Sequence, residues 1–242
     1  ILQKAMEKIK WSLNKFVEKK RIRPEHAEEA LARIKPTTTY EGYVEDADFA
    51  IEAIVERLDI KKQVFSKLDS LMPEHAILAS NTSSLSITEM GRATKRPDKV
   101  AGMHFFNPPQ LMQLVEVIKG EDTSDETVNV VMELARKLGK TPVLCKKDVR
   151  GFIVNRILMP VFLDAFWALH KGEVDKEAVD ASMKYDAGFP MGIFELADYV
   201  GLDIILEVGK VMYEAYGERA KPCPLVEELV KEGKLGQKSG AG

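Results

Sequence analysis

One of the four histidines lies in a setting that suits acid–base chemistry. His104 ends an apolar stretch, the turn Pro108-Pro109-Gln110 follows, and Glu116 lies inside a second apolar stretch, Leu114–Ile118. If the chain folds back around Gln110, His104 and Glu116 face each other in an antiparallel pair. A glutamate that accepts from one imidazole nitrogen fixes the tautomer and leaves the other nitrogen free to act as a general base. The same spacing also fits a buried His–Glu pair with no catalytic role.

Other polar side chains occur where ligands commonly bind in α/β proteins. The run Ser80–Ser84 follows an apolar strand, and in an open sheet ligands bind beyond the carboxyl ends of the strands. A serine-rich turn with a helix cap explains the same run without any ligand. Asn155 is a lone amide in an apolar helix, where it serves either a substrate or a polar packing contact. The remaining histidines are expected at the surface: His26, His75 and His170.

The composition narrows the class of protein. The 242 residues include 35 basic and 38 acidic side chains, and the net charge of −3 gives no strong field for nucleic acid or an acidic membrane. The basic segment Lys19–Arg23 is interpreted as a solvated helix end. No apolar run is long enough to cross a membrane, and no metal-ligand spacing occurs. Two distant cysteines, Cys145 and Cys223, indicate a reducing compartment, and we expect a cytoplasmic protein.

The hydrophobic periodicity predicts helices alternating with strands up to residue 145, and helices alone after residue 151. This pattern is typical of an α/β domain with a mainly parallel sheet, followed by an all-helical domain. Strands are expected at residues 37–40, 48–54, 76–80, 100–106, 114–118 and 141–145. Helices are expected at residues 2–16, 24–35, 59–71, 87–93, 125–138, 152–169, 176–183, 201–216 and 224–232.

The predicted domain boundary lies between residues 147 and 150, which divides the chain into 1–148 and 149–242. Ile1 enters a helix without a cap and Gly242 lies in a glycine-rich turn, so we expect a fragment or the ordered part of a longer chain. No G-x-G-x-x-G fingerprint follows a strand, and no P-loop occurs. The residues alone therefore do not indicate a nucleotide cofactor.

Several motifs together resemble those of the L-3-hydroxyacyl-CoA dehydrogenase family. They occur in the order found in that family, at similar intervals, and they span nearly all of the chain. Such a set is far more specific than one short motif. The motifs are Ser80-Asn81-Thr82-Ser83-Ser84-Leu85, His104-Phe105-Phe106-Asn107-Pro108, Leu114-Val115-Glu116-Val117-Ile118, Gly151-Phe152-Ile153-Val154-Asn155-Arg156, Gly188–Leu196 and Asp198–Asp203.

The resemblance implies a Rossmann-type NAD-binding domain followed by a helical domain for substrate binding and dimerisation. It implies reversible oxidation of an (S)-3-hydroxyacyl-CoA to a 3-ketoacyl-CoA, with hydride passing to NAD. His104 would remove the proton of the 3-hydroxyl group, while Glu116 would orient His104 and stabilise its imidazolium. Ser83, Asn155 and Asn107 would position the substrate or hold the site together. The residues on the cofactor side would be Glu56, Lys61, Asn81, Ser83 and Asn107.

The resemblance also implies the partners: an acyl-CoA substrate, a second copy of the chain bound through the helical domain, and a fused or associated enoyl-CoA hydratase. Family members begin with a strand, a glycine-rich turn, a helix and a second strand. The sequence lacks these elements, so its Rossmann-type domain is expected to be truncated at its start. Two alternatives stay open. One is a related 3-hydroxy acid dehydrogenase with the same His–Glu pair, and the other is a non-catalytic structural homologue or fragment.

Overall fold

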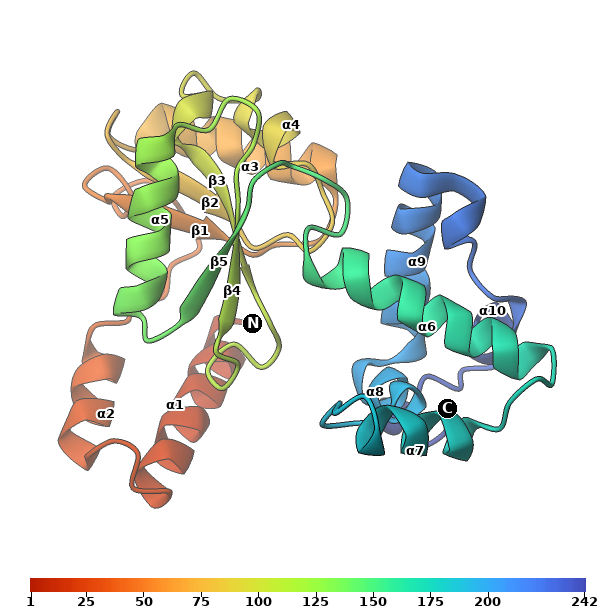
Figure 1. Ribbon diagram of the computed structural model, residues 1–242. Coiled ribbons are helices and arrows are strands. Elements are labelled where there is room, and N and C mark those ends of the chain that lie inside the picture. The colour runs from red at the N-terminus through yellow and green to blue at the C-terminus, as the bar shows by residue number, and fades with distance from the viewer.

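A five-stranded sheet forms the centre of the first part of the chain (Figure 1). The computed structural model describes all 242 residues. The strands are β1 (Phe49–Glu52), β2 (Ile77–Ser80), β3 (Val100–Phe105), β4 (Leu114–Ile118) and β5 (Thr141–Cys145), in the order β1-β2-β3-β4-β5. All neighbours are parallel except β3 and β4, which run antiparallel. The mainly parallel sheet predicted from the sequence is therefore confirmed.

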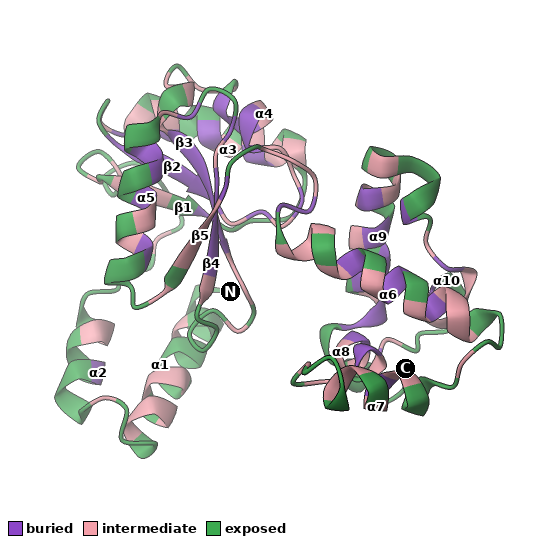
Figure 2. Cartoon of the chain, in the orientation of Figure 1, coloured by how far each residue is buried: buried purple, intermediate pink, exposed green.

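Helices cover both faces of the sheet, because successive strand residues point to opposite faces. On one face, α3 (Leu58–Leu71) and α4 (Ile87–Gly91) pack on the strands through apolar residues that include Phe65, Met90 and Leu78. On the other face, α5 (Asp125–Lys137) contributes Val131 to a second apolar cluster. Figure 2 shows the central strands β2, β3 and β4 buried between these layers. The side-chain hydroxyl of Ser124 caps α5, as its position in the sequence predicts.

Two helices precede the sheet, α1 (Leu2–Glu18) and α2 (Pro24–Ala32), and they form a hairpin that stands away from it (Figure 1). The strand predicted at residues 37–40 is wrong, since this segment is an exposed irregular connection. The hydroxyl of Thr37 bonds within the segment, donating to the backbone oxygen of Thr39. β-Branched residues form a strand only where the segment pairs with a sheet, and residues 37–40 pair with none of its strands.

The second part of the chain contains only helices, in agreement with the prediction. The helices are α6 (Val154–His170), α7 (Lys176–Tyr185), α8 (Ile193–Val200), α9 (Leu202–Tyr216) and α10 (Pro224–Lys231). They enclose their own apolar core, which includes Phe162, Ile205 and Met212. Single 3-10 turns occur at Pro97–Lys99, Gly217–Ala220 and Gln237–Ser239. No helix of the structure has the length and apolar character that crossing a membrane requires.

Helix α8 has no counterpart in the sequence-based prediction. It is only 8 residues long, and its first turn is stabilised from another helix. The buried carboxylate of Asp180 on α7 accepts hydrogen bonds from the backbone amides of Phe194 and Glu195. The carboxylate of Glu195 adds a local contact by accepting from the backbone amide of Gly192 at 2.9 Å, so a distant and a local residue together cap the start of α8.

Candidate active site

The hairpin of β3 and β4 brings His104 and Glu116 together. The two residues are directly opposite in the antiparallel register, as their spacing around the turn predicts. The Nδ1 atom of His104 lies 2.7 Å from a carboxylate oxygen of Glu116. His104 is 5% exposed and Glu116 is 0% exposed, so water does not screen the contact. The predicted pair is therefore a buried hydrogen bond.

The carboxylate of Glu116 has all its donors inside the protein. Oε2 faces His104, while Oε1 accepts from the backbone amides of Ile153 and Val154 at 2.9 and 2.8 Å. These amides lie at the start of α6, where backbone N–H groups have no partner within the helix. The second part of the chain thus holds one oxygen of a carboxylate whose other oxygen contacts the histidine.

The second ring nitrogen of His104 is left free for chemistry. An ionised carboxylate only accepts, so the neutral ring carries its proton on Nδ1 and a lone pair on Nε2. The structure has no buried side-chain nitrogen or oxygen atom without a hydrogen-bond partner. Because no protein group bonds to Nε2, this atom must be accessible to solvent. The rings of Phe106 and Phe152 pack against the imidazole at centroid distances of 4.7 and 5.8 Å. The geometry suits an oriented general base.

The run Ser80–Ser84 forms a turn around the carboxylate of Glu56. Oε1 of Glu56 accepts from the hydroxyl of Thr82 at 2.5 Å and from the backbone amide of Ser83 at 3.0 Å. It also accepts from the amide and hydroxyl of Ser84, both at 3.3 Å. The hydroxyl of Ser83 has no partner within the chain. The side-chain amide of Asn155 reaches the backbone oxygen of Ser83 at 3.5 Å, which brings α6 next to this turn.

Lys61 lies inside the protein rather than at its surface. Its side chain is 1% exposed, and the ammonium contacts the carboxylates of Glu52 at 2.7 Å and Glu56 at 3.3 Å. The other oxygen of Glu52 accepts from the hydroxyl of Ser80 at 2.6 Å. Lys61 therefore reaches the turn at Ser80–Ser84 only through these two carboxylates. Glu52 was not among the predicted site residues, although it is a carboxylate in an apolar strand, the same signal that indicated Glu116.

The remaining predicted residues lie at the ends of β2 and β3. The side-chain oxygen of Asn81 accepts from the backbone amide of Phe105 at 2.8 Å, which ties the two strand ends together beside His104. Asn107 is exposed, and its side chain makes no hydrogen bond within the chain. The other three histidines are exposed, as expected.

The cysteines take no part in this site as nucleophiles. Both Cys145 and Cys223 are buried free thiols. Burial raises the pKa of the Cys145 thiol above its usual value, and the negative charge of Glu116 adds to the rise. Burial likewise raises the pKa of Cys223. A thiol whose pKa is raised stays protonated and is a poor nucleophile.

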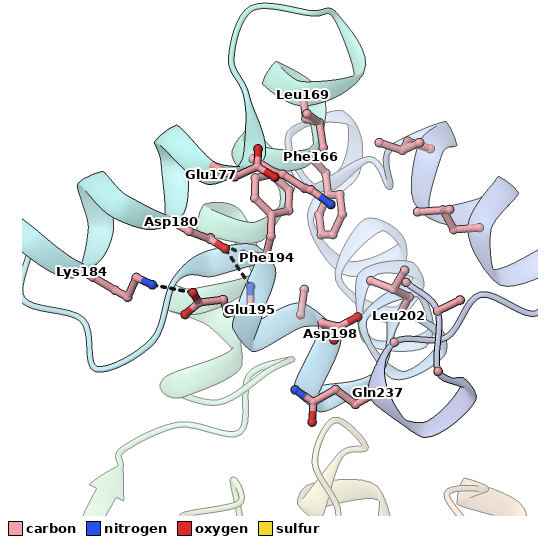
Figure 3. Close-up of a pocket in the computed structure, with 18 residues that line it drawn as sticks. Phe166, Leu169, Glu177, Asp180, Lys184, Phe194, Glu195, Asp198, Leu202 and Gln237 are labelled. Atoms are coloured by element: carbon pink, nitrogen blue, oxygen red, sulfur yellow. Dashed lines mark hydrogen bonds and ion pairs between the residues drawn. The ribbon is translucent and has the colours of Figure 1, made fainter.

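A cavity of about 980 Å³ lies elsewhere, in the helical part of the chain (Figure 3). Three of its charged residues already have partners, since Lys184 pairs with Glu195 and Asp180 accepts the amides at the start of α8. It contains none of the predicted site residues. We therefore assign the candidate active site to the His104 region on the basis of its chemistry, not of cavity size.

Two family models match the chain. Residues 1–149 match the 3-hydroxyacyl-CoA dehydrogenase NAD binding domain, and residues 151–242 match the 3-hydroxyacyl-CoA dehydrogenase C-terminal domain. The chain belongs to the 3-hydroxyacyl-CoA dehydrogenase family. This confirms the resemblance carried by the sequence motifs, and it identifies the chain as a member of a family of NAD-dependent oxidoreductases.

Similar proteins agree with this membership. The mitochondrial hydroxyacyl-coenzyme A dehydrogenase of Sus scrofa is 43% identical over 100% of this chain and 79% of its own length. The 3-hydroxybutyryl-CoA dehydrogenase of Clostridioides difficile is also 43% identical, over 100% of this chain and 85% of its own. The solved (S)-3-hydroxybutyryl-CoA dehydrogenase from Ralstonia eutropha superposes with a TM-score of 0.94 at 40% identity, over 99% of this chain and 84% of that one.

The site of this 3-hydroxyacyl-CoA dehydrogenase family member offers groups that fit NAD. The strands β1, β2 and β3 are parallel, so their carboxyl ends share one edge of the sheet. Dinucleotides bind beyond that edge in open α/β sheets. The unpaired hydroxyl of Ser83 and the exposed amide of Asn107 lie in the loops that follow β2 and β3. These groups can donate to and accept from the ribose and carboxamide groups of a dinucleotide.

The buried ion pair beneath this edge gives a stability prediction. We expect Lys61→Met to lower the free energy of unfolding by about 3–5 kcal/mol, because it leaves the carboxylate of Glu52 buried without a cation. The double substitution Lys61→Met with Glu52→Gln removes both charges and should recover most of the loss. Urea unfolding followed by circular dichroism measures both variants.

The neighbouring lysine supplies the control for this prediction. Lys62 forms an exposed pair with Glu89 at 2.7 Å, so Lys62→Met should change the stability by less than about 1 kcal/mol. A Lys61→Met protein as stable as the Lys62→Met protein would show that the ammonium of Lys61 is not needed by Glu52.

Proposed function

We propose that the chain catalyses the reversible oxidation of an (S)-3-hydroxyacyl-CoA to a 3-ketoacyl-CoA with NAD. The observation that carries this proposal is the free Nε2 of His104, whose ring is oriented by a carboxylate that is itself fully hydrogen-bonded. A purely structural His–Glu pair would need no accessible nitrogen. The same observation argues against a non-catalytic homologue.

His104 performs the proton transfer of the reaction. Its Nε2 takes the proton of the 3-hydroxyl group, and the carbon–oxygen bond becomes a carbonyl as hydride leaves carbon 3. A bound NAD supplies the acceptor for that hydride. The imidazolium that forms lies 2.7 Å from Glu116, whose negative charge stabilises it. In the reverse direction His104 returns the proton to the developing alkoxide.

The surrounding polar groups orient the reactants. We assign the hydroxyl of Ser83 and the amide of Asn155 to the substrate, because Asn155 contacts the Ser83 backbone and α6 begins beside His104. We assign Asn107, Asn81 and Ser83 to the nicotinamide side of the cofactor. The remaining two cofactor residues, Glu56 and Lys61, support the site indirectly. Glu56 accepts from the backbone amide of Ser83 and so fixes the turn, and the ammonium of Lys61 contacts Glu56. Their contribution is therefore to the shape of the site.

We also propose a division of labour between two domains, 1–148 for NAD and 149–242 for substrate binding and dimerisation. Each part encloses its own apolar core, which supports the division. Exposed apolar side chains of the helical part support a homodimer: Ile157, Tyr185, Tyr199, Val200 and Ile204.

The chemistry of the proposed substrate indicates which enzyme supplies it. Hydration of an enoyl-CoA gives a 3-hydroxyacyl-CoA, so we propose a fused or associated enoyl-CoA hydratase as a partner in β-oxidation. One solved relative, 25% identical with a TM-score of 0.63, is the dehydrogenase part of a multifunctional enzyme from C. elegans.

We propose a cytoplasmic location, supported by two free buried thiols. The mammalian relatives are named as mitochondrial enzymes, whereas the name of a bacterial relative, a probable 3-hydroxybutyryl-CoA dehydrogenase, states no location.

The proposed function and its base are tested together by His104→Gln. Wild-type protein should oxidise NADH with acetoacetyl-CoA, followed at 340 nm, and should prefer it to free 3-keto acids. The variant should fold normally and lose about 10²–10⁴-fold in kcat, because it lacks the general base. His75→Gln, an exposed histidine paired with Asp48, is the control and should keep full activity. Wild-type turnover by His104→Gln would overturn the assignment.

The role of Glu116 is tested by Glu116→Gln. The amide oxygen must accept from Ile153 and Val154, so the amide nitrogen faces Nδ1 of His104 and donates to it. The proton of the neutral ring is then on Nε2 and no charge stabilises the imidazolium, so kcat should fall by about tenfold or more. Binding of NAD and of acetoacetyl-CoA, measured by calorimetry, should stay within about threefold of wild type. A variant with unchanged kcat would mean that Glu116 is only structural.

The dimer is tested by sedimentation velocity. The double substitution Tyr199→Asp with Ile204→Asp places charge on exposed apolar positions of α8 and α9, and we expect it to convert dimer to monomer at micromolar concentration. Trp11→Asp makes the same change at an exposed aromatic of α1 and should leave the dimer intact. A wild-type protein that sediments as a monomer would contradict the proposed homodimer.

A further inference from the structure

The chain turns through two left-handed residues immediately before α6. Gly151 has a φ of 76° and Phe152 a φ of 48°, and the next two residues present their amides to Glu116. We call residues Gly151 and Phe152 the corner. A left-handed conformation is unfavourable for a phenylalanine, so other contacts must hold it there.

Burial of the phenylalanine ring provides those contacts. Phe152 is 2% exposed and belongs to the apolar cluster between the sheet and α3, which includes Phe65 and Leu78. Its ring also meets the imidazole of His104 edge-on, at 5.8 Å between centroids. Phe152 thus lies in the core of the sheet domain while its backbone leads into the first helix of the helical domain.

The glycine of the corner has no room for a side chain. A Cβ atom at position 151 would lie 2.7 Å from the sulfur of Met212 on α9 and 3.2 Å from the backbone nitrogen of Arg156 on α6. Both distances are shorter than ordinary contacts. The sulfur of Met212 can shift with its flexible side chain, whereas the nitrogen of Arg156 is backbone, so the first turn of α6 would have to move by a few tenths of an ångström. The path of the backbone into α6 is therefore fixed by packing from both helices.

Hydrogen bonds fasten the residues before the corner to both domains. The guanidinium of Arg150 donates to the backbone oxygen of Ser84 at 3.1 Å, and the hydroxyl of Tyr216 on α9 donates to the backbone oxygen of Arg150 at 2.8 Å. The carboxylate of Asp148 accepts from the hydroxyl of Ser86 at 2.6 Å. The corner is thus a defined structural element and not a flexible linker.

We propose that the corner, Gly151 and Phe152, is a positioning element for the reaction. It holds the amides of Ile153 and Val154 on Oε1 of Glu116, so the carboxylate cannot rotate and only Oε2 faces His104. The placement of the helical domain thereby sets the orientation of the base. The proposal rests on the proposed roles of His104 and Glu116 and adds residues that touch neither substrate nor cofactor.

The substitution Gly151→Ala tests the proposal with a matched control at the other end of the same helix. Gly172 follows α6, has a φ of 69°, and has open space where a Cβ would lie. Both alanine variants suffer the same left-handed penalty, but only Gly151→Ala displaces the amides. We expect kcat to fall by roughly tenfold or more in Gly151→Ala, with both KM values within about threefold of wild type. Gly172→Ala should keep the wild-type kcat.

A spectroscopic readout on the protein without substrate separates this proposal from the proposed function. The proton on Nδ1 of His104, which is hydrogen-bonded to a carboxylate, should give a low-field signal in the proton NMR spectrum. Its loss in His104→Gln assigns the signal. We expect the signal in wild type and in Gly172→Ala, and its loss or displacement in Gly151→Ala. A folded Gly151→Ala protein with an unchanged signal and unchanged kcat would overturn the proposal, whatever the activity of His104→Gln.

A second variant covers the case in which Gly151→Ala does not fold. Phe152→Leu keeps an apolar side chain in the core but loses the ring that meets His104 and holds the left-handed backbone. We expect the same loss of kcat and the same change of the imidazole signal. A folded Phe152→Leu protein that matches wild type in both measurements would equally overturn the proposal.

Discussion

The structure depends on a single buried carboxylate, that of Glu116. Removing a carboxylate from water costs several kcal/mol unless hydrogen bonds replace its hydration. Glu116 obtains those bonds from His104 on β3 and from two amides at the start of α6. The antiparallel register of β3 and β4 and the entry of the chain into the helical domain must both be correct for this arrangement. A fold that satisfies Glu116 has thereby already oriented His104.

A second buried carboxylate, that of Glu52 on β1, applies the same constraint three strands away in the sheet. Glu52 is matched by the ammonium of Lys61 and the hydroxyl of Ser80, and the same ammonium reaches Glu56. Glu56 in turn gathers four donors from the turn after β2. Charges that would be costly alone thus satisfy each other. The result is a rigid turn that leaves the Ser83 hydroxyl unpaired.

The helical domain contributes to the candidate site, whereas the proposed base, His104, lies on β3. Its first helix provides two amides for Glu116 and the side chain of Asn155 beside Ser83. The site therefore lies where the two domains meet, whereas the cavity of about 980 Å³ lies within the helical domain and contains none of these groups. Membership of the 3-hydroxyacyl-CoA dehydrogenase family accounts for both domains, since each matches its own family model.

The sequence by itself determined the strand and helix periodicities, the Ser124 cap and the pairing of His104 with Glu116. These depend on neighbouring residues: a turn midway between the two, and a carboxylate that an apolar strand cannot leave unpartnered. Residues 37–40 resembled a strand but pair with no strand of the sheet, and α8, which takes part of its cap from Asp180 on another helix, was not predicted. Only the tertiary structure decided that Lys61 is buried and that α6 binds Glu116. Those partners are separated along the chain, as Glu116 and Ile153 are by 37 positions, so packing and not local pattern brings them together.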